Sequence, residues 1–302
     1  MTAATPTPVA IAPTERFEPA LMRRKLTATI FYGACLAAIG ILLLALVLLL
    51  VQVLVRGLPW LDIDFLTGVP SRRASSTGIL PAIVGSLEIA LIVGLISFPV
   101  GVAAAIYLSE YARDSRVNRL LQTNISNLAG VPSIIYGILG LAVFVRLLGL
   151  GTTVLAAALT LSLLILPVII IASIEALRAV PNAQREGAYA LGATRWQMVR
   201  RSVFPAAAPG VMTGIILAMA RAIGEAAPLL LIGAAGFVTF LQNPVSGSFS
   251  VLPVIAYNYA KRPQDDFQGV SGATIIVILV LMLVLNALAL IVRARLSRHI
   301  QW

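Results

Sequence analysis

Charged residues are scarce in this chain: Asp, Glu, Lys and Arg make up 11% of its 302 residues, against about 25% in ordinary soluble domains. Hydrophobic residues make up 59%, so a soluble globular domain is excluded and a membrane protein is expected. The single cysteine, Cys35, excludes a disulfide framework within the chain. The net charge of +10 would fit a nucleic-acid partner, but the arginines cluster at the ends of apolar runs, as topology signals do, and we expect no nucleic-acid binding.

The sequence also has few side chains suited to catalysis. Its one histidine, His299, lies in the C-terminal tail, where a solvated residue is expected. One histidine, one cysteine and three scattered charges in apolar runs make no acid–base or metal constellation, so we predict a non-catalytic chain without metal or cofactor. A membrane-embedded enzyme is the rival class. No G-x-x-x-x-G-K-[ST] motif occurs, and the only lysines are Lys25 and Lys261, so any ATP and Mg²⁺ would be bound by a partner.

Six apolar runs are long enough to cross a bilayer, for which a helix needs about 20 apolar residues. We place them at residues 28–55, 79–108, 126–148, 152–174, 208–234 and 272–293. The predicted fold class is all-α, a polytopic membrane protein with six transmembrane helices in one domain, residues 26–296. Residues 1–25, which begin with a stretch rich in Thr, Ala and Pro, are expected to form a disordered tail, and residues 297–302 a short one.

The basic residues predict how these spans are oriented. Most of the 22 Arg and Lys residues fall in the two tails, between the second and third spans, and in the long loop at 175–207, all on one side of the membrane. The positive-inside rule assigns that side to the cytoplasm. We therefore expect a multi-pass protein of the cell membrane, with both termini and the 175–207 loop in the cytoplasm and with loops 56–78 and 235–271 outside.

The long cytoplasmic loop predicts short helices separated by sharp turns. Pro181 should stop the helix that leaves the fourth span, and Asn182 should cap a new one. Gly192 suits the left-handed position at which that helix ends. Thr194 and Gln197 form a T-x-x-Q capping box for a third helix.

On this third helix, Trp196, Val199 and Val203 are expected to share one side, with Arg195 largely on another. Pro205 should end the helix before the fifth span. A helix of this size is marginal alone and needs a docking surface. From its shape alone, that surface is either a partner protein or the lipid headgroups, on which basic amphipathic helices commonly lie.

The most unusual segment is Ala218–Pro228, near the middle of the fifth span. It places Arg221 and Glu225 where hydrocarbon is expected, and a charge at the centre of a membrane helix costs about 2.5–3.5 kcal/mol on insertion scales. Four residues apart on a helix, the two can touch. We predict that they form a path for an anion; the alternative is a buried ion pair that fixes helix register. Gly210 and Gly214 form a GxxxG that favours close helix packing.

Two further polar side chains lie within predicted spans. Glu88, in the second span, either lines a path, lies near a helix end, or bonds to Ser86 or to another helix. Tyr136, in the third span, either presents its hydroxyl to the path or packs at an interface.

The cytoplasmic loop resembles the EAA motif of ABC importer permeases, which reads E-A-A, three residues, G, nine residues, I-x-L-P. The matching positions here are Glu186, Ala188, Gly192 and Pro205. The chain departs from that consensus at Gly187, Ser202 and Phe204. The resemblance implies that the loop is a coupling helix seated in a groove of an ATPase subunit, which favours a protein partner over lipid.

By this resemblance, five residues of the loop touch the ATP-hydrolysing partner or shape the surface that touches it. They are Glu186, Ala188, Gly192, Arg195 and Trp196. The loop also argues against a simple channel, because a channel needs no site for an ATPase.

Other segments narrow the resemblance to phosphate importers. Their third-span signature is similar to residues 127–145, NLAGVPSIIYGILGLAVFV, and their fifth-span signature to residues 221–230, RAIGEAAPLL. The A-type permease subunit, the PstA family, is similar at residues 252–268, LPVIAYNYAKRPQDDFQ, and at the closing NALALIVRARL. The implied partners are a C-type permease subunit, two copies of a cytoplasmic ATPase and an external phosphate-binding protein. An importer permease for sulfate or molybdate is the alternative within the class.

Overall fold

The computed structural model of this chain describes residues 21–113, 115–234, 237–241, 243–245 and 247–297. Over these residues the chain is helical and forms no extended strand, so the predicted all-α class is confirmed. Five helical stretches are long and apolar enough to cross a membrane, and a bent pair of helices supplies a sixth if it is counted as one span. Most of the expected N-terminal tail, and His299 with its neighbours, lie outside the described residues.

Two compact units divide the chain, residues 1–51 and 52–302. In the first unit, the described residues belong to helix α1 (Leu21–Gly57), and every side chain from Arg24 to Val51 is exposed. This stretch is almost entirely apolar from Ile30 onward, so its surface is suited to lipid rather than to water.

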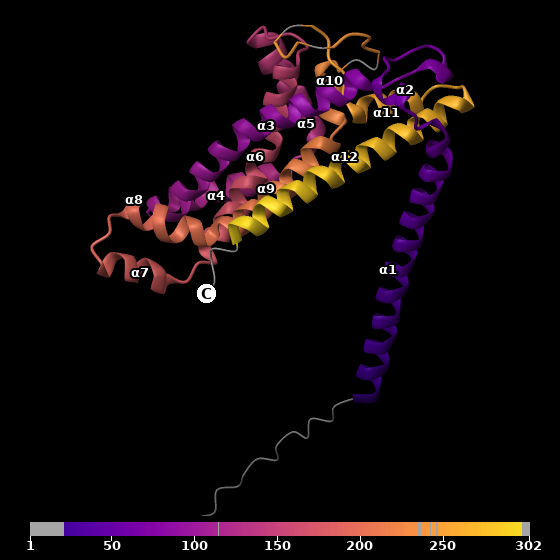
Figure 1. The fold of residues 1–302 in the computed structure, drawn as a ribbon. Coiled ribbons are helices and arrows are strands. Elements are labelled where there is room, and N and C mark those ends of the chain that lie inside the picture. The colour runs from indigo at the N-terminus through magenta and orange to yellow at the C-terminus, as the bar shows by residue number, and fades with distance from the viewer. Residues whose placement is uncertain (1–20, 114, 235–236, 242, 246, 298–302) are drawn as a thin grey trace, which may run out of the picture. The chain divides into compact units, whose positions relative to one another are not determined.

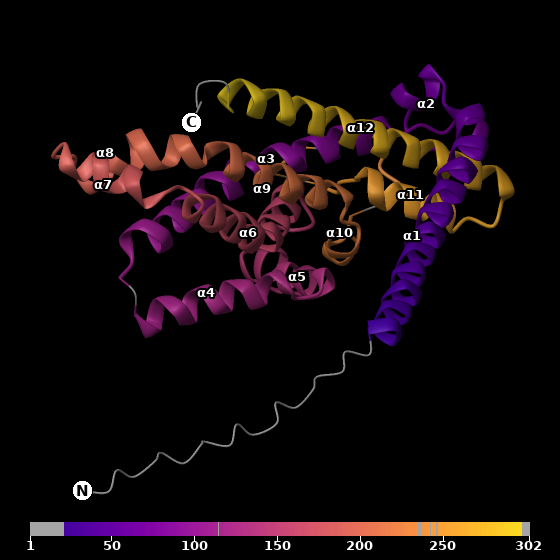
Figure 2. The ribbon, with the colours of Figure 1, turned by 90° about the horizontal axis from the view of Figure 1, so that it is seen from below.

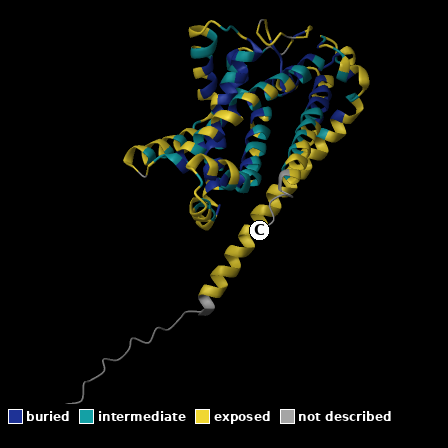
Figure 3. Ribbon diagram, turned by 60° about the vertical axis from the view of Figure 1, so that its left-hand side comes forward, coloured by how far each residue is buried: buried dark blue, intermediate teal, exposed yellow. Residues whose placement is uncertain are grey.

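The second unit holds the remaining helices. Its α-helices are α2 (Ile63–Thr67), α3 (Leu80–Ile106), α4 (Arg116–Ala129), α5 (Ser133–Gly140), α6 (Val154–Arg178), α7 (Asn182–Ala190), α8 (Arg195–Met198), α9 (Phe204–Gly224), α10 (Ala227–Ile232), α11 (Leu252–Ala260) and α12 (Asp265–Ser297). Three π turns join or extend them: η3 (Tyr107–Tyr111), η4 (Leu141–Leu147) and η5 (Val199–Val203). The most buried span is α6, which packs against both α3 and α9, while α12 packs along α9 (Figures 1 and 2). Figure 3 shows the buried residues concentrated inside this helix bundle.

The close packing predicted for the GxxxG of the fifth span is confirmed. A methyl group at Gly210 would lie 2.8 Å from the Cβ of Ala176, and one at Gly214 would overlap the Cβ of Ala172. Small residues on both helices therefore let the backbones of α6 and α9 approach closely. In lipid the hydrophobic effect does not drive helices together, so the van der Waals contact of this close packing stabilises the association of α6 with α9.

Enlarging Gly214 should loosen this contact. We expect Gly214→Leu to destabilise the protein by about 1–3 kcal/mol, the usual cost of overpacking, as measured by denaturant unfolding in detergent micelles. Gly40→Leu is the matched control, because no atom lies within 4 Å of a methyl group at Gly40. Equal free energies of unfolding for the two variants would show that α6 and α9 can move apart without loss of stability.

The third span differs from the prediction of one helix over residues 126–148. The chain instead forms α4 and α5, which meet at an angle of 98°. The break falls at Gly130–Pro132, because Pro132 offers no backbone N–H and biases Val131 away from helical geometry. The fourth span then begins after Gly149 and Gly151, whose positive φ angles of 67° suit glycine.

The expectation that Pro205 ends the preceding helix is wrong. Residues Arg195–Gly224 form one continuous helical stretch that contains the π turn η5. The wide turn places Pro205 in the first turn of α9, where a missing backbone N–H costs little. The end of the predicted loop at 175–207 and the fifth span therefore belong to one helical stretch, without a flexible joint between them.

Buried residues around Tyr259 attach α11 to the segment before α3. Tyr259 is fully buried, its hydroxyl lies 2.9 Å from the Oγ1 of Thr77, and it donates a hydrogen bond of 3.1 Å to the carbonyl of Gly78. Burial raises the pKa of Tyr259, so the phenol stays protonated and keeps this donor.

Candidate functional site

The predicted contact between Arg221 and Glu225 is present. The Nε of Arg221 lies 3.3 Å from the Oε1 of Glu225. The two do not, however, share one helix: α9 ends at Gly224, and Glu225 follows in extended geometry with φ −78° and ψ 119°. The glutamate therefore reaches back toward the last turn of the helix that carries the arginine.

The fifth span is broken at this pair, and the prediction of one helix over 208–234 is wrong. After Glu225 and Ala226 the chain starts a second short helix, α10, with Pro228 in its first turn, and α10 ends at Gly233 with φ +103°. Proline is tolerated in the first turn of a helix because the backbone N–H groups there have no helical partner. A break inside a membrane span leaves backbone groups without helical partners, and such breaks are tolerated where the chain is buried in protein or lines a water-filled cavity.

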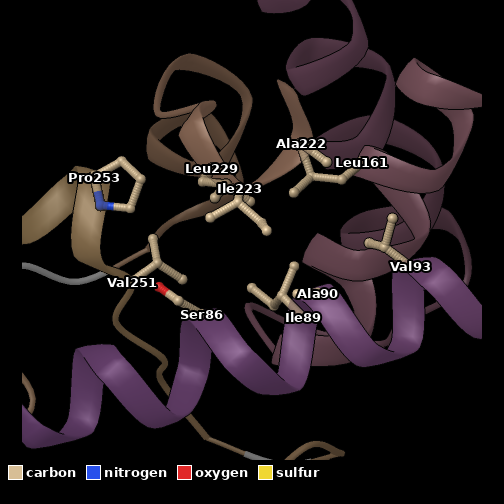
Figure 4. Close-up of a pocket in the computed structure, with 10 residues that line it drawn as sticks. All are labelled: Ser86, Ile89, Ala90, Val93, Leu161, Ala222, Ile223, Leu229, Val251 and Pro253. Atoms are coloured by element: carbon tan, nitrogen blue, oxygen red, sulfur yellow. The ribbon is translucent and has the colours of Figure 1, made fainter. Parts of the chain in front are cut away.

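One side of the break is packed against other helices. There α3, α6 and the start of α11 close around a cavity of about 10 Å³ whose apolar lining includes Ala222, Ile223 and Leu229 (Figure 4). That volume holds at most about one water molecule. By contrast, the side chains of Arg221 and Glu225 are 43% and 18% exposed. The guanidinium and its carboxylate therefore lie on a more open face of the chain than the apolar residues of the break.

Tyr136 and Glu88, the other two polar side chains predicted within spans, differ in their hydrogen bonding: Tyr136 has a partner, and the Oε2 of Glu88 has none among the described residues. Tyr136 donates its hydroxyl to the carbonyl of Leu128 at 2.9 Å, a bond that ties α5 to α4 across the break in the third span. The Oε2 of Glu88 is buried and has no hydrogen-bond partner among the described residues. The Ser86 hydroxyl, one of its predicted partners, instead accepts a bond of 2.9 Å from the backbone N–H of Leu252.

The loop at residues 175–207 is built as the sequence predicts in two respects. Gly192 has φ +78° and follows the end of α7, where a residue with a side chain would be strained. The capping box is complete, since Thr194 accepts from the N–H of Gln197 at 3.3 Å and Gln197 accepts from the N–H of Thr194 at 2.9 Å. Asn182 is not the cap of α7 as expected; Pro181 holds that position and Asn182 is the first helical residue.

The expected apolar side of the third helix is only partly right. Val199 and Val203 are buried, but Trp196 is 57% exposed, because the neighbouring side with Met198 contacts the core instead. Glu186 and Arg195 are exposed, while Ala188 is half-buried. The loop thus presents exposed apolar and charged side chains together, as a docking surface does.

Sequence reasoning missed the ion pair that attaches this loop to the bundle. The Nη2 of Arg185 lies 2.7 Å from the Oε1 of Glu110, and its Nε lies 3.3 Å from the Oε2. The same guanidinium donates to the carbonyls of Val180 and Leu177 at 2.7 and 2.9 Å. One side chain of α7 therefore holds both the end of α3 and the end of α6.

A signal for this pair was present in the sequence. Glu110 is an acid immediately beyond the second predicted span, in a region where basic residues predominate. An acid that is buried there needs a cation, and Arg185 lies in the loop on the same predicted side.

The chain is similar to known transport proteins. The family model described as binding-protein-dependent transport system inner membrane component matches residues 97–301. The probable ABC transporter permease protein YqgI of Bacillus subtilis is 37% identical over 212 residues, 69% of this chain and 71% of that protein. The phosphate transport system permease protein PstA 1 of Mycobacterium tuberculosis is 33% identical over 284 residues, 91% of each chain.

A solved structure supports the same comparison at the level of the fold. A chain of a bacterial ABC transporter involved in the import of the acidic polysaccharide alginate superposes with a TM-score of 0.65. The match covers 91% of this chain and 98% of that chain at 17% identity, so it shows a common fold alone.

Proposed function

This chain belongs to the family of binding-protein-dependent transport system inner membrane components, and from that premise we propose that it is a permease subunit that imports inorganic phosphate. The observation that carries the substrate is the Arg221–Glu225 pair at the break of the fifth span. The phosphate permeases among the relatives support the same assignment.

The pair is suited to an anion that must bind and leave again. Phosphate carries one to two negative charges near neutral pH, and moving it through hydrocarbon without compensation is prohibitive. Arg221 offers a permanent positive charge and a forked donor that matches an oxyanion. Glu225 neutralises that charge when no solute is present. In transit the guanidinium exchanges the carboxylate for phosphate, and the same carboxylate then competes for it and promotes release.

Energy enters through the cytoplasmic loop. In this proposal α7 and the exposed residues around it, Glu186, Arg195 and Trp196 among them, dock on an ATPase subunit that binds ATP and Mg²⁺. The continuous helical stretch Arg195–Gly224 links that docking surface to Arg221 without an intervening loop. Movement of the loop can therefore displace the end of α9 directly. The chain itself carries no catalytic step.

The proposed assembly has a defined topology and composition. Both termini and the loop face the cytoplasm of a cell membrane, as the distribution of arginine indicates. A related C-type permease subunit stands beside this chain, two ATPase copies lie beneath, and a phosphate-binding protein delivers the solute from outside.

The test is uptake of labelled phosphate in a strain that lacks this chain. Uptake should fall to background and return when the chain is supplied, and an excess of unlabelled sulfate should leave it unchanged. Unaltered phosphate uptake in the deleted strain, or competition by sulfate as strong as that by phosphate, would overturn the assignment in favour of another oxyanion.

A further inference from the structure

A basic cleft lies beside the cytoplasmic loop, apart from Arg221. Its volume is about 660 Å³, within the usual range for ligand sites of about 300–1,000 Å³. It opens where η3, α4, α6, α7 and α8 come together at the ends of the second and fourth spans. Its charged lining consists of Glu110, Arg119, Arg178, Arg185 and Arg195.

The charges of this lining are unbalanced. The one carboxylate, Glu110, is occupied by Arg185 at 2.7 Å. Arg178 has an acidic neighbour only at 3.5 Å, Glu175, and both of their side chains are more than half exposed. Within the described lining, four guanidinium groups accompany one carboxylate, and the exposed pair of Arg178 with Glu175 is weak in water. The partly enclosed space therefore keeps an excess of positive charge, which attracts anions.

Two of the guanidinium groups are held in place before any ligand arrives. Arg178 donates to the Oε1 of Gln122 at 2.7 Å, so that α4 positions a side chain of α6. Arg195 is stacked on Tyr111, with its guanidinium carbon 5.3 Å from the ring centroid. Stacking uses the face of the guanidinium and leaves its N–H edges for an acceptor.

We propose that this cleft binds a phosphate group. Planar, forked guanidinium groups from three helices suit the several oxygens of a phosphate better than a single-point anion. Two sources share this chemistry, the headgroup of an anionic phospholipid and free inorganic phosphate. The cleft lies at the ends of membrane spans, where basic pockets between helices bind lipid headgroups, and the adjacent α4 exposes Val117, Leu120 and Leu121, which suit acyl chains. These features favour the lipid source.

The experiment uses the full chain purified with its accompanying subunits. The complex is placed in nanodiscs of phosphatidylcholine alone or with added cardiolipin, and, in the lipid-neutral discs, with added inorganic phosphate or sulfate. Thermal stability and retained cardiolipin, measured by native mass spectrometry, are compared between wild type, Arg178→Gln and Arg119→Gln. Arg72→Gln, an exposed arginine in the segment between α2 and α3, is the matched control.

Each cleft variant should weaken retention of the phosphate-bearing ligand by about tenfold, and the control should leave it unchanged. Stabilisation by cardiolipin that the variants lose assigns the lipid headgroup. Stabilisation by inorganic phosphate in neutral discs, lost in the same variants, assigns the free ion. The proposal is overturned if neither ligand distinguishes wild type from the variants, including the case in which the variants lose only the ATPase subunit.

The proposal stands apart from the transported solute. Arg178→Gln and Arg119→Gln alter no residue of the Arg221–Glu225 pair, so loss of cardiolipin retention would be observed even if the substrate were another oxyanion.

Discussion

Replacing Arg221 with glutamine should reduce phosphate uptake by about tenfold to 100-fold without lowering the amount of protein in the membrane. The guanidinium supplies charge-assisted hydrogen bonds worth about 1.5–3 kcal/mol each, and glutamine can replace neither the charge nor the fork. Because the side chain is 43% exposed in a broken span, its removal leaves no core cavity. Uptake of labelled phosphate, with immunoblotting for protein level, measures the effect.

Three companion variants separate the roles of charge and geometry. Arg221→Lys keeps the charge but loses the fork, so uptake should be intermediate. Glu225→Gln removes the competitor for the guanidinium, so phosphate should bind more tightly and turn over more slowly. Arg295→Gln, at an exposed residue in the last turn of α12, makes the same chemical change away from the pair and should transport normally. Normal uptake by Arg221→Gln at normal protein level would leave the pair as a structural ion bridge only.

Local side-chain chemistry made much of the loop predictable. The capping box of Thr194 and Gln197 and the positive φ of Gly192 depend on residues only a few positions apart, so sequence alone specifies them. The close approach at Gly214 also followed from spacing. The all-α class, read from the apolar runs, also agrees with the fold of the alginate transporter chain.

The breaks in the spans could not be predicted with the same rules. Apolar runs have no strong period in a membrane, so hydropathy alone cannot tell a straight span from the 98° bend at Pro132 or the stop at Gly224. Proline usually ends a helix, but the helix continues through Pro205. The π turn at Val199–Val203 shifts the hydrogen-bond register by one residue before it. Proline alone does not locate a break either, since Pro99 and Pro167 lie inside the continuous helices α3 and α6.

The ion pair between Arg185 and Glu110 is expected to have the largest effect on stability. Arg185→Gln should destabilise the protein by about 3–5 kcal/mol, because it leaves a carboxylate that is 6% exposed without its cation. It also frees the carbonyls of Leu177 and Val180 from a charged donor. Denaturant unfolding in detergent micelles measures this loss, with Arg201→Gln, at an exposed position of η5, as the control.

The same pair should determine how well ATP hydrolysis drives transport. Since Arg185 joins α7 to η3 and to the end of α6, a loop without it can move without moving those two elements, and more ATP should be hydrolysed per phosphate imported. Glu110→Gln combined with Arg185→Gln should cost less than the sum of the two single changes, because each single change already breaks the pair. Additive costs would mean that the two side chains act independently. An unchanged ratio of ATP to phosphate in a variant that still folds would confine the pair to stability, and the link from loop to spans would then pass through the continuous helix Arg195–Gly224 alone.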